Sequence, residues 1–195
     1  MKKEFKNLLV GLALGDGHIT KNGRSLRIQH CAKQKEYLQY KIDLINSYLG
    51  TDKVKIHEFD NSGYPGVRMW YFNPFCKHIR RWLYKDGYKK IKKELLYRLT
   101  DREIAIWYMD DGCLYDSHKG TGHMQLKIST CCKTQAEALD LIEFMSHKYD
   151  AHFFIIKEKG KYSIGCGKQS AKKFLDKIKP FVIDSMSYKL LDHEK

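Results

Sequence analysis

One pattern occurs twice in this sequence, as Leu9-Val-Gly-Leu-Ala-Leu-Gly-Asp16-Gly17 and as Ile104-Ala-Ile-Trp-Tyr-Met-Asp-Asp111-Gly112, and each copy is an apolar helical stretch that runs into Asp-Gly. An Asp in the last turn of a helix faces the negative end of the helix dipole, which usually costs some tenths of a kcal/mol up to about 1. A single Gly-Asp-Gly is also typical of an ordinary helix end that runs into a turn. Because the pattern recurs, we expect a cation to compensate each acidic helix end.

Two further pairs of segments repeat in the same order along the chain. Arg27-Ile-Gln-His-Cys31-Ala-Lys33 aligns with Lys127-Ile-Ser-Thr-Cys131-Cys-Lys133, and Gly87-Tyr88-Lys89 aligns with Ser187-Tyr188-Lys189. A longer hairpin loop in the second copy, around residues 116–122, accounts for the small difference in spacing between the pairs. Matches in one order indicate an internal duplication. We therefore expect two repeats, residues 1–98 and residues 99–195.

The periodicity within each copy predicts an α+β fold made of two pseudo-symmetric α-β-β-α-β-β-α repeats. Turn and cap signals support this order: Asn22-Gly23 predicts a hairpin, Gly50 a helix C-cap, and Thr100 to Glu103 a capping box. We expect the first repeat to have helices near 4–15 and 33–49, strands near 53–59 and 67–72 around a turn at 60–66, and a helix that opens at Asn73-Pro74. We expect the second to have helices near 134–148 and 168–178 and strands that flank Gly160.

Small residues on the first apolar helix predict how the repeats meet. Gly11, Ala13 and Gly15 would let the equivalent helix of the second repeat approach closely, which gives a central two-helix interface. Asp16 and Asp111 would then lie at the same end of the pair. Two such carboxylates repel unless a proton or a metal lies between them. Oxygen ligands suit Mg²⁺, which can activate a water molecule for attack on a phosphodiester.

The composition favours a folded protein with a polyanionic partner. The chain has 36 Lys and Arg against 23 Asp and Glu, a net charge of +13, and 43% hydrophobic residues. This hydrophobic share allows a sizeable core, so disorder is not expected. The positive charge is spread along the chain, which favours nucleic acid, although a basic composition by itself also serves solubility.

Cysteine usage and hydropathy indicate the compartment. The six cysteines form no CxxC pair, so neither a zinc ribbon nor a disulfide framework is predicted, and we expect reduced thiols. No apolar run reaches the roughly 18 residues that a membrane span needs, and the start of the chain lacks a signal-peptide cleavage site. We expect a soluble protein of the cytoplasm, or of an organellar matrix, that is not secreted and does not bind a membrane.

The two acidic motifs resemble the LAGLIDADG motifs of single-chain homing endonucleases, and the resemblance extends over the whole chain. The second motif is similar to the form found in intron-encoded members. The first departs from the pattern at Leu14, where the family name has its first D, but Asp16 stands at the position that carries metal. The same position selects Asp111 over Asp110, which we expect to adjust the local field or cap the turn. Gly15 and Asp110 complete the metal neighbourhood that the resemblance implies.

The resemblance also implies the activity and its partners. Each repeat would carry a saddle-shaped antiparallel sheet that lies along the DNA major groove, while the acidic helix ends meet the minor groove over the scissile phosphates. The chain would act as a monomer with internal pseudo-twofold symmetry. It would cleave both strands of a long, asymmetric double-stranded target with Mg²⁺, and Mn²⁺ or Ca²⁺ could occupy the same site.

Strand residues are candidates for DNA contact because exposed polar and basic side chains alternate with apolar ones, as base-reading strands require. Any half-solvated sheet shows the same alternation. The expected contacts are Arg24, Arg27, Gln29, Lys55, His57, Arg68, Lys127, Ser129, Lys157 and Lys161.

Two lysines are the expected partners of the acids. Lys89 and Lys189 follow Tyr at equivalent places, and the resemblance implies a lysine near each active centre. A cation there could stabilise the developing phosphorane charge or orient the attacking water. Either Lys89 or Lys90 could be the lysine of the first active centre. Gln29, which matches Ser129, is a further catalytic candidate that could position water.

Two alternatives use the same fold without this activity. The protein could be an intron RNA maturase, with intron RNA as a second partner, or a DNA-binding protein that does not cleave. Retention of both Asp16 and Asp111 disfavours these interpretations, because two carboxylates would repel a phosphate ligand. A small-molecule metal hydrolase would need His or further carboxylates at ligand spacing, such as HExxH, and the sequence has none.

Overall fold

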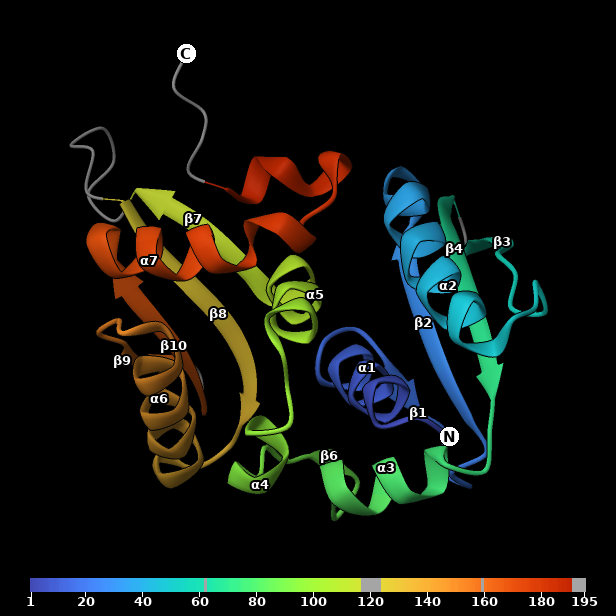
Figure 1. Cartoon of the computed structure of the whole chain (residues 1–195), viewed down its shortest axis with the longest axis horizontal. Coiled ribbons are helices and arrows are strands. Elements are labelled where there is room, and N and C mark those ends of the chain that lie inside the picture. The colour runs from blue at the N-terminus through green and yellow to red at the C-terminus, as the bar shows by residue number, and fades with distance from the viewer. Residues whose placement is uncertain (62, 117–123, 159, 191–195) are drawn as a thin grey trace.

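The computed structural model describes all residues except 62, 117–123, 159 and 191–195, and two copies of one motif build it (Figure 1). The first copy consists of α1 (Lys3–Leu14), β1 (His18–Ile19), β2 (Ser25–Cys31), η1 (Ala32–Gln34), α2 (Lys35–Leu49), β3 (His57–Asn61), β4 (Tyr64–Phe72) and α3 (Cys76–Leu83). A hairpin of β5 (Tyr84–Lys85) and β6 (Tyr88–Lys89) and the short α4 (Lys93–Leu96) lead to the second copy. That copy consists of α5 (Asp101–Asp111), β7 (Gly112–Asp116), β8 (Met124–Cys132), α6 (Gln135–Tyr149), β9 (Phe154–Glu158), β10 (Lys161–Gly167), α7 (Lys168–Ile178), η2 (Lys179–Phe181) and η3 (Asp184–Lys189).

The two four-stranded sheets have the same strand order. The first runs β1-β2-β4-β3 and the second β7-β8-β10-β9, and all neighbouring strands pair antiparallel. Each copy thus places its long second and fourth strands at the centre of its sheet. The predicted α+β fold with two α-β-β-α-β-β-α repeats is confirmed.

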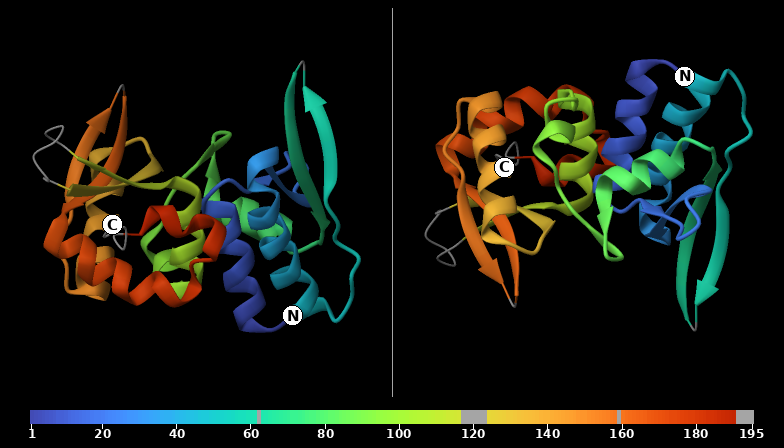
Figure 2. Two further views of the ribbon diagram at one scale, coloured as in Figure 1. Left: turned by 90° about the horizontal axis from the view of Figure 1, so that it is seen from above. Right: turned by 90° about the horizontal axis from the view of Figure 1, so that it is seen from below.

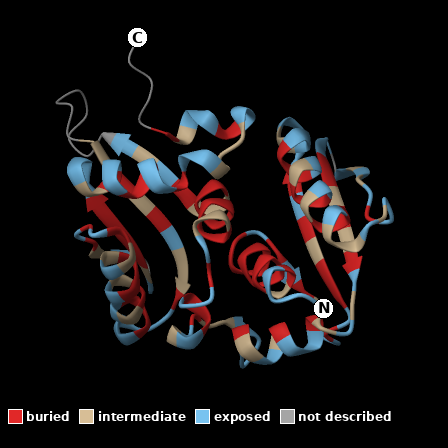
Figure 3. Cartoon of the chain, in the orientation of Figure 1, coloured by how far each residue is buried: buried red, intermediate tan, exposed pale blue. Residues whose placement is uncertain are grey.

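Helices α1 and α5 lie side by side between the two sheets (Figure 1). They are the most deeply buried elements of the centre, and their side chains form one continuous core with both repeats (Figure 3). At Gly11 the backbones come so close that an added Cβ would lie 2.7 Å from the Glu103 Cβ. The predicted close approach of the two apolar helices is therefore present.

Each sheet is covered by helices on one face only. In the first sheet Leu26, Ile28 and Met69 face the core and are fully buried, while the intervening residues are at least partly exposed. The hairpins β3–β4 and β9–β10 extend from the sheets toward the same side of the molecule, opposite the helices, with the central helix pair between them (Figure 2). The uncovered faces are therefore positioned to flank one elongated ligand.

The turn glycines and the helix cap adopt the backbone conformations that the sequence predicted. Gly23, Gly50 and Gly160 all adopt positive φ, at 68°, 63° and 80°. Thr100 and Glu103 form the capping box of α5. Among the described residues no helix is long and apolar enough to cross a bilayer.

The boundaries of the β3–β4 hairpin differ from the prediction. The expected strand near 53–59 begins only at His57, and most of the expected turn at 60–66 is strand, because the chain reverses tightly at Gly63 (φ 87°). Pro65 has no backbone N–H to donate to a neighbouring strand. It is tolerated in β4 because β2 ends opposite Gly66, so that Pro65 is paired on one side only, with Asp60 of β3. Helix α3 likewise begins after Asn73-Pro74, at Cys76. The expected longer loop at 116–122 lies, apart from its first residue, outside the described residues.

The closeness of α1 and α5 can be tested at Gly11. We expect Gly11→Ala to destabilise the protein by about 1–3 kcal/mol, because the new methyl group would overlap Glu103 and force the helices apart. In an unconstrained helix the same change would stabilise by roughly 1 kcal/mol. Urea denaturation measures the difference. Gly167→Ala is the control, since its methyl group would meet no atom within 4 Å; a Gly11→Ala variant as stable as the parent would contradict the packing argument.

Candidate active site

The two acidic motif residues come from equivalent helix ends. Asp16 follows α1 directly after its C-cap Gly15, and Asp111 is the last residue of α5. The Asp16 side chain is 41% exposed. The Asp111 residue is more buried, and its Oδ2 accepts a hydrogen bond of 3.0 Å from the indole N–H of Trp107, one turn earlier on the same helix.

The pKa values of both acids show that negative charge is crowded here. Burial, followed by the charges of Asp110 and Asp16, raises the pKa of Asp111 to about 7, and Lys89 opposes this shift. Burial and the charge of Asp110 also raise the pKa of Asp16, against the nearby Lys41 and Lys89. The acids therefore lie in a setting that favours a bound cation or a proton.

Asp110 belongs to the second repeat, but its side chain contacts residues of the first repeat. Its side chain is fully buried: Oδ1 pairs with Lys41 Nζ at 2.5 Å, and Oδ2 accepts the backbone N–H of Asp16 at 3.0 Å. A Cβ at Gly15 would lie 2.1 Å from this Oδ2. The glycine of the first motif therefore provides the space that the additional aspartate of the second motif fills.

His30 links the same groups from β2. Its Nδ1 lies 3.4 Å from Asp16 Oδ2, and its Nε2 lies 3.1 Å from Lys41 Nζ. Burial and the Lys41 charge lower the pKa of His30 to about 4, against Asp110 and the side chain of Gln34. The ring is therefore neutral at physiological pH. Asp16, Gln29 and His30 also line one open hollow of about 380 Å³.

Sequence analysis did not single out His30 or Lys41. One signal was present, because Lys41 lies four residues from both Tyr37 and Ile45, on the apolar stripe of α2. A lysine on such a stripe needs an acidic partner. That partner lies 69 positions away in the other repeat, so the helix pattern alone could not identify it.

The two predicted lysines reach the backbone directly before the two acids. Lys89 Nζ donates to the Gly15 carbonyl oxygen at 2.5 Å, and Lys189 Nζ donates to those of Met109 at 2.5 Å and Asp110 at 3.4 Å. Burial lowers the pKa of both lysines, and the nearby acids oppose the shift.

The structure distinguishes Lys89 from its competitor in the sequence. Lys90 Nζ lies 3.5 Å from Glu137 Oε1, at the start of α6, while Lys89 reaches the acidic helix ends.

The uncovered face of the first sheet carries several predicted DNA contacts. On this face Arg68 of β4 is in register with Gln29 of β2 and with His57 of β3. Two residues along the same strands, Arg27 of β2 pairs with Trp70 of β4. The Arg27 guanidinium lies over the Trp70 ring at 5.4 Å, and that of Arg68 over the Phe59 ring at 4.8 Å. Stacking on these rings restrains both arginines on the face. Arg24 lies just before β2, whereas Lys55 lies in the loop before β3, outside the strands.

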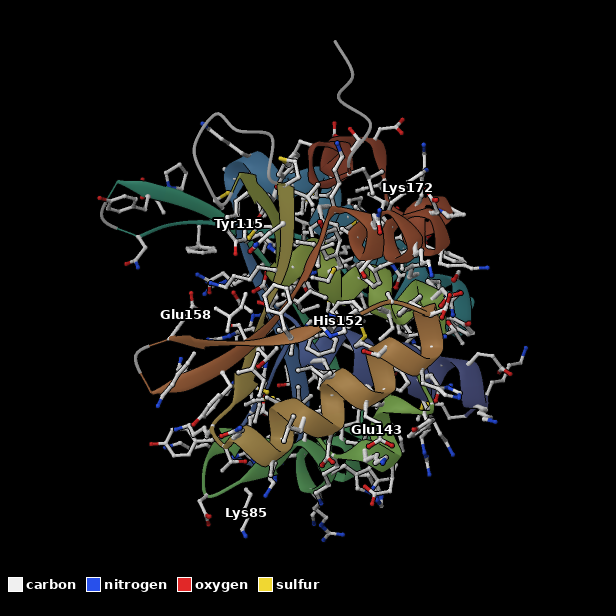
Figure 4. All side chains as sticks on the ribbon, turned by 90° about the vertical axis from the view of Figure 1, so that its left-hand side faces the viewer. Lys85, Tyr115, Glu143, His152, Glu158 and Lys172 are labelled. Atoms are coloured by element: carbon white, nitrogen blue, oxygen red, sulfur yellow. The ribbon has the colours of Figure 1, made fainter. Side chains whose placement is uncertain are left out.

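The second sheet has a different surface. Lys127 is in register with Gly165 and forms an ion pair with Glu158 of β9. Ser129 is exposed on the same strand face as Lys127, and Lys161 stands opposite Glu158. Figure 4 shows Glu158 toward the side to which both long hairpins point.

Lys157 lies on the other side of its sheet from Lys127. Lys157 lies two residues after Ile155, which is in register with the buried Ile164, and Ile164 pairs with the buried Ile128 of β8. Strand alternation therefore puts Lys157 on the helix-covered side of the sheet, away from Lys127.

Oxygen donors dominate the centre. Asp16, His30 and Asp110 offer ligand atoms within 4.8 Å of one another, but Lys41 already pairs with Asp110. The carboxylates of Asp16 and Asp111 remain as hard ligands, and the Gly15 carbonyl oxygen, which accepts from Lys89, lies beside them. Burial first, and then repulsion by Asp110 and Asp16, raises the pKa of Asp111, so a divalent cation would favour its ionised form. The donor set therefore fits Mg²⁺, Mn²⁺ or Ca²⁺.

The sequence profile of the LAGLIDADG DNA endonuclease family matches residues 6–174, a range that contains both acidic motifs and both sheets. The chain belongs to the LAGLIDADG DNA endonuclease family. Membership in the LAGLIDADG family confirms the resemblance that the two motifs carried.

Individual LAGLIDADG relatives cover the chain almost completely. The structure of the homing endonuclease I-WcaI bound to its DNA recognition sequence matches with a TM-score of 0.78, over 97% of this chain and 87% of its own, at 27% identity. DNA endonuclease I-ChuI from Chlamydomonas applanata is 25% identical over 100% of this chain and 98% of its own length. Protein RecA from Mycolicibacterium flavescens is 28% identical over 94% of this chain, which spans only 45% of that protein.

The pKa of Asp111 predicts a pH-dependent stability. Asp111 ionises at about 7 in the folded protein, against an ordinary value of 3.8. Between these values the folded state holds a proton that the unfolded state has lost, so the stability of the metal-free protein falls as the pH rises from about 4 to 7. Asp111→Asn stays neutral and can still accept the Trp107 hydrogen bond, so it escapes this loss.

We therefore expect metal-free Asp111→Asn to exceed the parent in stability at pH 8 by a few kcal/mol, since each pKa unit corresponds to about 1.4 kcal/mol, and to lose this gain near pH 4. Urea denaturation with a chelator across this range measures it. Asp176→Asn, which changes an exposed acid on α7 in the same way, is the control for the loss of one carboxylate. A gain that does not change with pH would show that ionisation of Asp111 is not its cause.

Proposed function

We propose that this protein is a site-specific double-strand DNA endonuclease that uses Mg²⁺, with residues 1–98 and 99–195 as the two halves that bind a long, asymmetric target. One observation carries the proposal. The two acidic helix ends meet at the centre, and a sheet with an uncovered, partly basic face lies on each side of them (Figure 2). The family and the likeness to a homing endonuclease solved with DNA support the same function.

Divalent cations at Asp16 and Asp111 would supply the Lewis acid and lower the pKa of an attacking water molecule. The chain's own part is to place the two carboxylates at neighbouring helix ends, where burial and mutual repulsion favour a bound cation or a proton. Above pH 7, where Asp111 is ionised, this charge is available for a cation. Because protons compete with metal for Asp111, cation affinity should fall as the pH drops below 7.

Lys89 and Lys189 would stabilise the negative charge that develops on the phosphate oxygens. Both ammonium groups lie within hydrogen-bond distance of carbonyl oxygens that precede the acids, and both lysines are partly buried, so water and salt screen their charge less than at the surface. Gln29, exposed beside Asp16, is placed to orient water in the hollow that it shares with His30.

The uncovered sheet faces would read the two half-sites. In the first repeat Arg27 and Arg68 are held on aromatic rings, and arginine forks fit the O6 and N7 acceptors of guanine. In the second repeat Lys127 and Glu158 form a donor and acceptor pair. Different side chains at matched positions suit a target whose halves differ. Further contacts would come from Arg24, His57, Ser129, Lys161 and, from its loop, Lys55.

The setting of the activity is also part of the proposal. Each repeat supplies one acid and one sheet, so a single chain contains a complete pair and would act as a monomer. The six cysteines carry free thiols, which suits a reducing compartment inside the cell.

The catalytic assignment is tested with Asp16→Asn and Asp111→Asn. Cleaved duplexes selected from a randomised library with Mg²⁺ first identify the target. We expect both variants to lose double-strand cleavage of that target and to keep binding it, because Asn removes a charge that only the metal needs. Gel shift and cleavage assays on the same samples separate the two properties. Variants that cut as well as the parent would exclude this mechanism.

The DNA-facing surface is tested by two substitutions that each remove one positive charge. We expect Arg68→Ala to weaken binding by roughly 10–100-fold, the cost of a lost bidentate base contact, and Lys157→Ala, on the opposite face, to change it much less. Fluorescence anisotropy at several salt concentrations measures both, and affinity should fall steeply with salt because phosphate contacts release counterions. Equal losses in both variants would contradict the face assignment.

A further inference from the structure

Asp16 is held by a closed ring of polar contacts. The ring runs from Asp16 Oδ2 to His30 Nδ1 at 3.4 Å, from His30 Nε2 to Lys41 Nζ at 3.1 Å, from Lys41 Nζ to Asp110 Oδ1 at 2.5 Å, and from Asp110 Oδ2 back to the Asp16 backbone N–H at 3.0 Å. The side chain and the backbone of one acid are thus both restrained by the same three residues.

The chemistry of Lys41 sets the direction of its own two hydrogen bonds, to His30 and to Asp110. A lysine ammonium only donates, so His30 Nε2 must accept and the imidazole proton must lie on Nδ1, which faces the Asp16 carboxylate. Lys41 also donates to Asp110, whose ionised carboxylate accepts from both Lys41 and the Asp16 backbone. The His30 Nδ1 lies 3.4 Å from Asp16 Oδ2, and the Gln34 side chain also hydrogen-bonds to His30, so the imidazole is oriented between Lys41, Gln34 and the Asp16 carboxylate.

The three residues that surround Asp16 in the ring are buried. The side chains of Lys41 and Asp110 are 0% exposed and that of His30 is 2% exposed. The Lys41 ammonium also lies over the Tyr37 ring at 4.1 Å. Breaking such a pair would leave an uncompensated buried charge, so the ring resists rearrangement.

Among the described residues the second acid has a different support, because its Oδ2 accepts from the Trp107 indole N–H. The duplication aligns His30 with Thr130 and Lys41 with Leu141, while Gly15 stands where the second motif has Asp110. Thr130 is engaged elsewhere, with its hydroxyl on the Tyr162 carbonyl oxygen. The ring therefore belongs to one side of an otherwise duplicated centre.

We propose that His30, Lys41 and Asp110 are positioning residues for Asp16 alone, so that the two halves of the active centre are unequal. Cleavage of the strand served by Asp16 depends on the ring, and cleavage of the strand served by Asp111 does not. The inference rests on the proposed endonuclease function. Damage to the ring should turn a double-strand cut into a nick in one particular strand.

The test uses the full chain and its selected target duplex, with a different fluorophore on each strand, under single-turnover conditions with Mg²⁺. Asp16→Asn identifies the strand that depends on Asp16. His30→Phe keeps an aromatic ring but removes both nitrogens. We expect it to slow cleavage of that strand by about 10–100-fold, as for residues that orient metal ligands, and to leave the other strand nearly unchanged, so that nicked DNA accumulates.

Two further variants separate positioning from folding. Lys41→Met with Asp110→Asn removes the buried charges together and keeps an acceptor for the Asp16 N–H, so it should fold and still nick selectively. Thr130→Val, at the matched position of the second repeat, should not favour either strand. Equal slowing of both strands by His30→Phe, or no slowing in a variant with the parent's melting temperature, would overturn the proposal.

A failure of the ring can be told from a failure of the proposed function. A parent protein that cuts no duplex of the randomised library refutes the endonuclease. The ring is then judged by the nitrogen chemical shifts of labelled His30, which should show the proton on Nδ1. A proton on Nε2 would refute the ring whatever the activity.

Discussion

The close contact between α1 and α5 is the constraint on which the rest of the structure depends. Gly11 removes the side chain that would separate the helix backbones at Glu103, and Gly15 leaves room for the Asp110 carboxylate. The C-terminal ends of the two helices lie together, where the Asp16 N–H donates to Asp110 Oδ2, so acids from distant parts of the sequence become neighbours. The sheets then take positions on either side, because each repeat packs its own sheet behind its own helix.

This contact brings several carboxylates together in a partly buried region. Their charges are treated differently by the neighbouring residues. Asp110 is compensated within the protein by Lys41, in a pair that is fully buried. Asp111 is not compensated in this way, and its pKa rises to about 7 because burial and two neighbouring carboxylates disfavour its ionised form. The additional aspartate of the second motif is therefore structural in its contacts, while the motif acids keep their capacity for an external cation.

The two repeats share a scaffold but not a surface. Strand order and helix placement are the same in both, whereas the first sheet stacks arginines on aromatic rings and the second pairs a lysine with a glutamate. A duplication within one chain allows this divergence, because the halves need not remain identical as they must in a symmetric dimer. The ring around Asp16 extends the same asymmetry from the surface to the acidic centre.

Local patterns in the sequence determined the element order, the duplication and the acidic helix ends, because apolar runs, turn glycines and the capping box at Thr100 each act within a few residues. The turn-rich composition of residues 60–66 gave no information on cross-strand pairing, so only the structure placed the strand ends there. The side of the sheet on which Lys157 lies likewise depends on the strand register. A shift of one residue would place Lys157 on the opposite side. The role of buried Lys41 could be recognised only in the structure, where the packing of α1 against α5 brings Asp110 of the other repeat into an ion pair with it. Periodicity reports which face of an element is buried, whereas the partner of a buried charge depends on how the elements pack.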